Sequence, residues 1–238
     1  MAQTYTDWEL IIVDDASTDN TDEVVSSIMS SRTCSATTDS TKIHYLKNDR
    51  NSGAAVSRNR ALREAKGKWI AFLDSDDLWA PDKLEKQIAF MEKNGYAFSY
   101  TRYGEMDEEG NKTGVVVGGP AHISKTGMFN YCWPGCLTVM YNREVVGDIQ
   151  IADIRKNNDY AMWLKIVRKA DCYLLAENLA TYRKRTGSIS NHSYTSLIKW
   201  HYKLYREAEG LNPVVSLFNT GRNLFFGVWK KIKYVGKE

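Results

Sequence analysis

The densest group of chemically active side chains follows a short apolar run. The segment Phe72-Leu-Asp-Ser-Asp-Asp-Leu-Trp79 places Asp74, Asp76 and Asp77 within four residues. Carboxylates this close repel each other at neutral pH, and a divalent cation such as Mg²⁺ relieves the repulsion through oxygen ligands. Such a cation usually keeps some of its water and takes substrate phosphates as further ligands. The alternative is a solvated acidic turn in front of the helix expected from about Asp82 to Asn94.

Two further segments carry groups that suit a nucleotide. Asp14 and Asp15 follow another apolar run, Glu9–Val13, and acidic side chains accept hydrogen bonds from ribose hydroxyls and base N–H groups. The segment Asn51–Asn59 opens a predicted helix, with a glycine in its first turn and Arg58 nearby. Helix N-termini bind anions, so this segment suits a diphosphate. Together with the carboxylates at 74–77, these groups predict a site for a nucleotide-diphosphate donor.

Hydrophobic patterning predicts the elements that must position these groups. In the first hundred residues, short apolar runs that indicate buried strands alternate with amphipathic stretches that indicate helices. This order predicts an α/β fold with a mostly parallel sheet and helices on both faces. Ligands bind outside the carboxyl ends of strands in such sheets, so both acidic clusters should face one crevice. The expected strands are Glu9–Val13, Ile43–Leu46, Trp69–Leu73 and Tyr96–Tyr103, and the clearest helices are 53–66 and Asp82–Asn94.

The second half of the chain is less regular. Its expected elements are a hairpin turn at Glu108–Asn111, a strand at Leu137–Tyr141, a helix at Asp159–Lys169, strands at Cys172–Leu175 and Thr181–Arg183, and helices at 193–208 and 214–234.

Composition limits the classes of protein to which the chain can belong. The 238 residues are 43% hydrophobic and 26% charged, as in a folded globular protein, and the net charge of +3 is too small for a strongly basic nucleic-acid binder. There is no apolar run of about 18 residues, and the first residues do not resemble a signal peptide. The four cysteines form no CxxC pair, so we expect reduced thiols in a cytoplasmic protein.

An ordered series of blocks resembles the family 2 glycosyltransferases of GT-A fold. The blocks are Trp8–Asp19, Asn51–Gly53 with Arg58-Asn59, Ala71–Asp77, Gly135–Met140, Asp159–Leu164, and Tyr182-Arg183 with Gly187–Ser190. In detail they are most similar to bacterial transferases of teichuronic-acid and capsule assembly. The resemblance implies a GT-A domain at 1–210, with a Rossmann-like donor half at 1–103 and an acceptor half at 104–210. A basic amphipathic helix is expected at 211–238.

The resemblance also implies an activity and a role for each matching residue. An inverting enzyme of cell-envelope polysaccharide synthesis would move a sugar from a nucleotide-diphosphate donor, such as a UDP-sugar, to a glycan or a lipid-linked acceptor. Asp159 falls at the general base, although Asn158 stands where the family often has Glu. The expected donor-binding residues are Asp14, Asp15, Arg58, Asp74 and Ser75, and the expected ligands of a Mg²⁺ or Mn²⁺ ion are Asp74 and Asp76. Further candidates for phosphate or acceptor contacts are Asp77, Trp133, Arg183 and Arg185, with core packing or a solvated strand face as the alternatives.

One departure from the family concerns the N-terminus. Family members begin with a strand, a donor loop and a helix that have no counterpart here, which predicts a truncated chain. The strands that end at Asp15 and Asp74 should then each have an unpaired edge, and the nucleoside pocket should lack a wall. One alternative is therefore an impaired relative that only binds nucleotide. Another is a sugar-1-phosphate nucleotidylyltransferase, although its Gly-x-Gly-x-x-Arg loop is absent. The sugar, the acceptor and the oligomeric state are not predicted.

The last segment combines apolar and basic residues at helical spacing. Its apolar stripe comprises Leu217, Leu224, Phe225, Val228 and Ile232, and its basic residues include Arg222, Lys230, Lys231 and Lys233. This pattern is typical of an interfacial helix on anionic lipid, and it predicts peripheral contact with the inner face of the plasma membrane. The alternative is a helix packed on the domain with solvated lysines.

Overall fold

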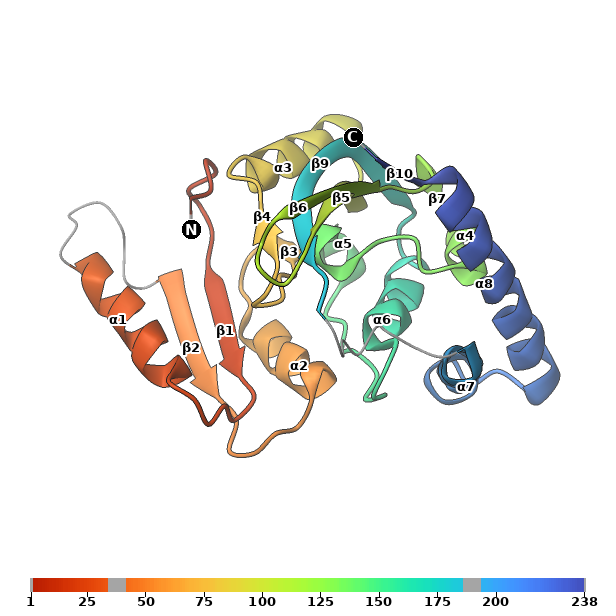
Figure 1. Ribbon diagram of the computed structural model, residues 1–238, viewed down its shortest axis with the longest axis horizontal. Helices are drawn as coiled ribbons and strands as arrows, with labels where there is room; N and C mark the ends of the chain where they lie inside the picture. The colour runs from red at the N-terminus through yellow and green to blue at the C-terminus, as the bar shows by residue number, and fades with distance from the viewer. Residues whose placement is uncertain (1, 34–41, 186–193, 238) are drawn as a thin grey trace.

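A computed structural model describes residues 2–33, 42–185 and 194–237 (Figure 1). The strands are β1 (Leu10–Asp14), β2 (Ile43–Lys47), β3 (Trp69–Ala71), β4 (Leu78–Trp79), β5 (Phe98–Met106), β6 (Lys112–Val117), β7 (His122–Ile123), β8 (Met140–Asn142), β9 (Cys172–Arg183) and β10 (Val235–Lys237). The α-helices are α1 (Thr21–Thr33), α2 (Ala54–Glu64), α3 (Lys83–Asn94), α4 (Lys125–Asn130), α5 (Arg143–Val146), α6 (Asn158–Ile166), α7 (Tyr194–Lys203) and α8 (Pro213–Lys233). A 3₁₀ turn spans Cys136–Thr138, and a π-helical turn at Leu204–Ala208 follows α7.

The larger sheet is built around β5. Along its whole length β5 pairs in parallel with β9, from Phe98 opposite Cys172 to Met106 opposite Arg183. On its other side β5 pairs antiparallel with β8 at its start and with β6 at its end. β3 continues the sheet beyond β8, and β10 continues it beyond β6.

The expectation of a mostly parallel sheet is wrong for this larger sheet. Its pairs other than β5–β9 are antiparallel in the part of the chain that the structure describes. The chain returns through a hairpin after β5, where Gly110 adopts a positive φ of 94°, and β8 runs back between β3 and β5. Because β8 is antiparallel to both neighbours, β3, β5 and β9 still run in the same direction. Their carboxyl ends therefore meet at one edge of the sheet.

The strand that precedes the first acidic pair lies in a separate sheet. β1 and β2 are parallel, with Leu10 opposite Ile43, as expected for two strands joined through a helix. Among the described residues β1 pairs only with β2, and β3 pairs only with β8. The predicted unpaired edges of these two strands are therefore present.

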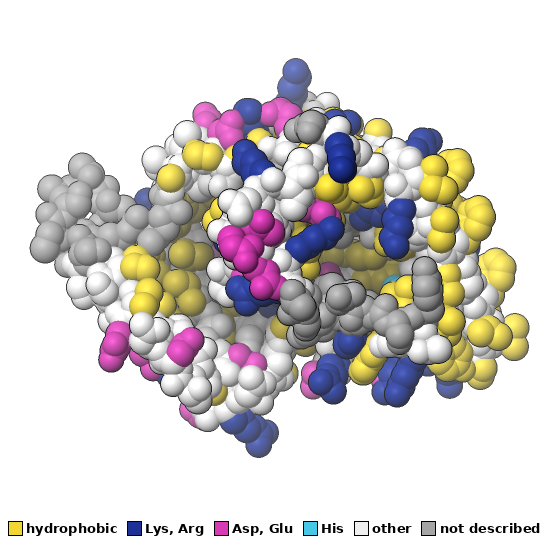
Figure 2. Space-filling model, viewed as in Figure 1, with side chains coloured by type: hydrophobic (Ala, Val, Ile, Leu, Met, Phe, Trp, Pro, Cys, Tyr) yellow, Lys and Arg dark blue, Asp and Glu magenta, His cyan; other side chains and the backbone are white. Residues whose placement is uncertain are grey.

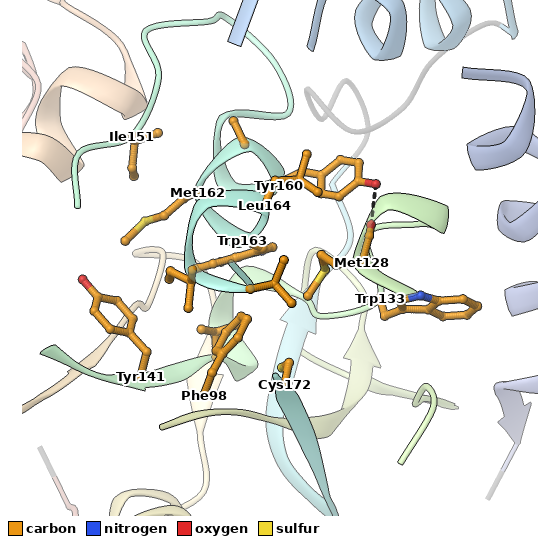
Figure 3. Packing of buried hydrophobic residues seen from close by; sticks show 14 of the residues in the cluster. Phe98, Met128, Trp133, Tyr141, Ile151, Tyr160, Met162, Trp163, Leu164 and Cys172 are labelled. Atoms are coloured by element: carbon orange, nitrogen blue, oxygen red, sulfur yellow. Dashed lines mark hydrogen bonds between the residues drawn. The ribbon is translucent and has the colours of Figure 1, made fainter. Parts of the chain in front are cut away.

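Helices cover both faces of the larger sheet, as expected. Alternation along β5 directs Phe98 and Tyr100 toward α6, and Ser99 accepts a hydrogen bond from Gln87 of α3 on the opposite face. The main core lies beneath α6, where Trp163 packs against Phe98 with ring centroids 6.1 Å apart (Figure 3). A smaller cluster of Ile88, Met91 and Met140 lies beneath α3.

Several boundaries in the second half differ from the expectation. The two strands expected at Cys172–Leu175 and Thr181–Arg183 are one long strand, β9, because β5 pairs with it across the whole interval. The strand expected at Leu137–Tyr141 divides into the 3₁₀ turn and β8. The block Gly187–Ser190 lies outside the described residues.

The core predicts a large difference between two tryptophans. Trp163 is 1% exposed, whereas Trp229 on α8 is 43% exposed. Trp163→Ala should lower the free energy of unfolding by about 3–5 kcal/mol through lost burial and a residual cavity. Trp229→Ala, the matched control, should change it by less than about 1 kcal/mol. Urea denaturation measures both values, and equal effects would contradict this assignment of the core.

Candidate functional site

The carboxylate loop after β3 is held in place by Arg183 at the end of β9. The backbone N–H of Arg183 donates to Asp77 Oδ1 at 2.9 Å, and its Nε donates to the carbonyl of Asp76 at 3.0 Å. Its Nη1 donates to the carbonyl of Glu108 in the β5–β6 hairpin at 2.8 Å. The carboxyl ends of β3, β5 and β9 thus converge on this loop. These contacts give Arg183 a structural role. This role differs from both alternatives that the sequence offered, a phosphate or acceptor contact and a solvated strand face.

Two of the loop's carboxylates form ion pairs. Asp76 Oδ2 lies 3.2 Å from Nε of Arg185, and Asp74 Oδ1 accepts a hydrogen bond from Arg58 of α2. An open cavity of about 480 Å³ lies beside Asp76. It is lined by Ser75, Asp76, Leu78, Glu108, Arg183 and Arg185. Four residues that the sequence singled out therefore line one cavity: Ser75, Asp76, Arg183 and Arg185.

Asp77 is the buried member of the loop. Burial raises its pKa to about 6 despite the hydrogen bond from Arg183, and the negative charges of Asp76 and Asp74 contribute in the same direction. Negative charge is therefore concentrated at this edge of the sheet.

Arg58 joins the carboxylate loop to Asn158, the residue before the predicted general base. Its Nη2 contacts Asp74, and its Nη1 donates to Oδ1 of Asn158 at 3.1 Å. Asn158 begins α6, and the next residue is Asp159, whose Oδ1 accepts the backbone N–H of Tyr160 at 2.8 Å. Asp74 and Asn158, from different halves of the chain, are thus connected through one guanidinium. The Asn that departs from the family pattern is the partner of Arg58.

Cys136 lies among these groups, although the sequence indicated only a packed loop there. Burial raises the pKa of its thiol; Arg58 acts against this, and the negative charges of Asp74 and Asp159 add to it. The side chain of Cys136 therefore lies close enough to Arg58, Asp74 and Asp159 for their charges to affect its thiol. No spacing pattern in the sequence could have identified Cys136 or Asn158 as neighbours of the site.

Asp15 binds the start of α2. Its Oδ1 accepts the N–H of Ser52 at 2.9 Å and the amide of Asn48 at 2.8 Å, and its Oδ2 accepts the N–H of Gly53 at 2.7 Å. Burial alone would raise the pKa of Asp15, but these hydrogen bonds hold it below its usual value. Two N–H groups at the helix start that seemed suited to a diphosphate are therefore bonded to an anion of the protein itself. Arg58 lies one turn further along the same helix.

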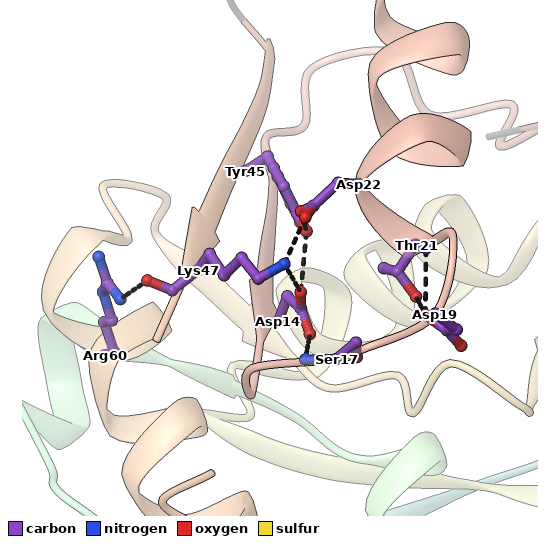
Figure 4. A network of polar contacts seen from close by, with 8 residues as sticks. All are labelled: Asp14, Ser17, Asp19, Thr21, Asp22, Tyr45, Lys47 and Arg60. Carbon is purple, nitrogen blue, oxygen red and sulfur yellow. Dashed lines mark hydrogen bonds and ion pairs between the residues drawn. The ribbon is translucent and has the colours of Figure 1, made fainter. Parts of the chain in front are cut away.

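Asp14 belongs to a network between β1, β2 and α1 (Figure 4). It is buried and accepts the N–H of Ser17 at 2.9 Å and the hydroxyl of Tyr45 at 3.0 Å, while Lys47 lies 3.5 Å away. The hydrogen bonds from Ser17 hold the pKa of Asp14 below its usual value, against the effect of burial. These contacts give Asp14 a role in shaping the turn that presents Asp15.

Trp133 lies in the core, which favours the packing alternative over contact with an acceptor. It is 4% exposed, its Nε1 donates to the carbonyl of Gly127 at 2.9 Å, and its ring packs edge-on against Tyr131, Phe226 and Tyr234.

The donor chemistry of the loop fits a divalent cation. Asp74 and Asp76 supply carboxylate oxygens, the ligands that Mg²⁺ and Mn²⁺ prefer, and both carboxylates contribute to the raised pKa of Asp77. Within the described ranges no three His, Cys, Asp or Glu side chains are already grouped around a common point. One oxygen of each of these carboxylates is paired with an arginine, Asp74 Oδ1 with Arg58 and Asp76 Oδ2 with Arg185.

Comparison with known proteins identifies the family. The profile of glycosyl transferase family 2 matches residues 1–144. A Bacillus subtilis glycosyltransferase named for teichuronic acid biosynthesis, TuaG, is 39% identical over 211 residues, which cover 88% of this chain and 80% of the relative. The Escherichia coli UDP-Glc:α-D-GlcNAc-diphosphoundecaprenol β-1,3-glucosyltransferase WfaP is 39% identical over 203 residues, or 84% of this chain and 74% of that protein. The chain belongs to glycosyl transferase family 2 and is a glycosyltransferase.

Solved structures confirm the GT-A fold. Staphylococcus aureus TarS in complex with UDP-GlcNAc superposes with a TM-score of 0.69 at 18% identity, over 98% of this chain and 70% of that one. The Pyrobaculum calidifontis mannosyltransferase PcManGT, in complex with GDP-Man and Mn²⁺, gives a TM-score of 0.58 at 16% identity, over 96% of this chain and 68% of that one. The α/β class expected from the sequence is therefore correct.

The raised pKa of Asp77 predicts a pH dependence of stability. Because the folded state holds this proton up to about pH 6 and the unfolded state releases it near 3.8, the contribution of Asp77 to stability falls as pH rises between these values. Asp77→Asn should abolish this pH-dependent loss of stability. Its amide oxygen can still accept the hydrogen bond from the backbone N–H of Arg183. Its stability relative to wild type should rise by about 2 kcal/mol between pH 4 and 6 and level off above about pH 7. Denaturation in chelator measures the difference, and a difference independent of pH would contradict the burial of this carboxyl.

Proposed function

We propose that this chain transfers a sugar from a UDP-sugar to a glycan or lipid-linked acceptor, with inversion at the anomeric carbon. The observation that carries the proposal is the pair of bonds from Arg58, to Asp74 on the donor side and to Asn158 beside Asp159. Donor-binding and base groups predicted from different halves of the sequence are thereby neighbours. UDP appears in the names of WfaP and of the TarS complex, which supports this donor class.

The donor-binding side uses the carboxylate loop, Ser75 and Arg58. A cation at Asp74 and Asp76 supplies positive charge to the departing diphosphate when bound, and PcManGT with Mn²⁺ supports this assignment. Arg58 and Arg185, once separated from their carboxylates, are positioned to bind diphosphate oxygens. Asp15 fixes the start of α2 and thereby sets the position of Arg58.

Asp159 acts as the general base. It accepts the proton of the acceptor hydroxyl as that oxygen attacks the anomeric carbon and the diphosphate leaves from the opposite side. One Asp159 oxygen accepts the N–H of Tyr160, which orients the carboxylate at the first turn of α6.

A lipid-linked acceptor would place the enzyme at the inner face of the plasma membrane as a peripheral protein. WfaP, whose name includes a diphosphoundecaprenol acceptor, supports this location. No helix in the described part of the chain is long and apolar enough to cross a bilayer.

The donor site predicts metal-dependent nucleotide binding. Calorimetric titration with UDP should show binding in Mn²⁺ that is lost in chelator. Asp76→Ala should weaken it at least tenfold, because a metal ligand is removed. Asp153→Ala, an exposed carboxylate elsewhere, is the matched control and should bind as wild type does. Binding to folded protein that ignores both the chelator and Asp76→Ala would show that the loop holds no cation.

The base assignment predicts a loss of turnover without a loss of donor binding. Asp159→Asn should lower kcat by about 10²–10⁴-fold, because the amide cannot accept the proton. UDP should bind as in wild type, and Asp153→Asn should leave kcat unchanged. An Asp159→Asn variant with normal transfer would overturn the assignment.

The nucleotidylyltransferase alternative is tested with the same protein. Formation of a UDP-sugar from UTP and a sugar 1-phosphate would support that alternative, whereas we expect none.

A further inference from the structure

Helix α8 attaches to the domain through a polar face. Its buried residues Ser216, Asn219, Thr220 and Asn223 are all polar. The amide of Asn223 donates to the hydroxyls of Tyr160 at 3.2 Å and of Tyr205 at 3.4 Å. Toward the C-terminal end Phe226 packs on Trp133, and Lys230 donates to the carbonyl of Trp133 at 2.8 Å. The first three turns of this helix therefore bury hydrogen-bonding groups where a helix on a core normally buries apolar ones.

The outward face of α8 is apolar. Its large exposed apolar side chains form two groups, one on each side of Gly221 and Arg222, and are between 39% and 78% exposed: Val214, Val215, Leu217 and Phe218, then Phe225, Val228, Trp229 and Ile232. Figure 2 shows hydrophobic atoms gathered along the edge where Figure 1 places α8. Most of the stripe expected from the sequence is therefore present, but it faces away from the domain. An exposed apolar surface of this kind marks an interaction site.

The charges beside this stripe are all positive. α8 contains no Asp or Glu, whereas Lys231 and Lys233 are exposed near its end and Arg222 lies in its middle. Lys237 follows on β10. Burial lowers the pKa of Lys230 to about 8, so this lysine belongs to the packed face and not to the charged surface. Both interpretations of the sequence placed Lys230 among the basic residues of the surface, and both are therefore wrong for this lysine.

We propose that the outward face of α8 docks on an anionic lipid bilayer, lying in the plane of the interface. The apolar stripe enters the boundary between headgroups and acyl chains, and Lys231 and Lys233 contact lipid phosphates. Trp229 has the amphipathic ring that favours this depth. A second copy of the chain fits less well, because its α8 offers no acidic side chain to Lys231 or Lys233.

The same contacts connect the docked helix to the site. Tyr160 follows Asp159 directly, and its hydroxyl bonds to Asn223 of α8 and to the carbonyl of Met128. Docking would therefore hold Asp159 at a fixed height above the membrane, where a lipid-linked acceptor carries its sugar. The docking of α8 does not depend on the proposed sugar transfer. The role of docking in holding Asp159 near a lipid-linked acceptor does rest on that transfer.

Flotation with lipid vesicles tests the docking. The folded chain should float with vesicles of equal parts phosphatidylcholine and phosphatidylglycerol, and should bind pure phosphatidylcholine vesicles at least tenfold more weakly. Lys231→Gln with Lys233→Gln should weaken binding to the anionic vesicles by about 30-fold, since each basic residue near the surface contributes a factor of about 5. Leu217→Ser and Ile232→Ser should each weaken it by about tenfold. High salt should weaken the binding of wild type.

Matched substitutions lie elsewhere on the surface. Val24→Ser on α1 and the pair Lys66→Gln with Lys93→Gln change exposed residues of the same types and should bind as wild type does. Absence of flotation by folded protein, equal loss in the control variants, or a dimer in sedimentation that Leu217→Ser dissociates would each overturn the proposal. UDP titration of the same sample separates this failure from failure of the donor site.

Discussion

The site depends on one guanidinium. Arg58 lies on the helix whose start Asp15 binds, and it contacts the carboxylate loop at Asp74 and the first residue of α6. Its planar group presents separate donors to the two partners, which a lysine could not do with the same geometry. A second contact between the segment after β3 and this helix is apolar, because the ring of Phe72 packs edge-on against Trp163 of α6 with centroids 5.7 Å apart. Arg58 is therefore both a structural link and a candidate ligand of the donor.

The direction of the strands explains why the remaining groups gather at the same edge. β3, β5 and β9 end together, so the carboxylate loop, the β5–β6 hairpin and Arg183 meet there. Arg183 bonds to backbone carbonyls of both the loop and the hairpin, which fixes the loop independently of its charge. The backbone of the loop is thus held by contacts separate from the ion pairs of Asp74 and Asp76.

Apolar runs and turn residues predicted the first half of the fold well. The elements that they did not predict are determined by pairing between strands that are distant in the sequence. Apolar runs gave β1, β2, β3 and β5 to within a few residues, and Gly95 ends α3 as expected. The antiparallel β8 follows from tertiary pairing, and strands of two or three residues such as β4 and β10 are too short to show a period. Among the candidate residues, Arg58 contacts Asp74 and the residue before Asp159, and the roles expected of all three stay predictions. The packing of Trp133 depends on contacts with residues distant in the sequence, which residue spacing does not predict.

The stereochemistry of donor breakdown tests the central claim most directly, because it needs no knowledge of the acceptor. If Asp159 activates the attacking oxygen across the site from the diphosphate, water admitted in place of the acceptor should attack the face opposite the leaving group. Proton NMR of slow UDP-glucose hydrolysis should then show β-glucose as the first sugar released, with α-glucose appearing only by mutarotation. Release of α-glucose first would contradict a single displacement with Asp159 as its base.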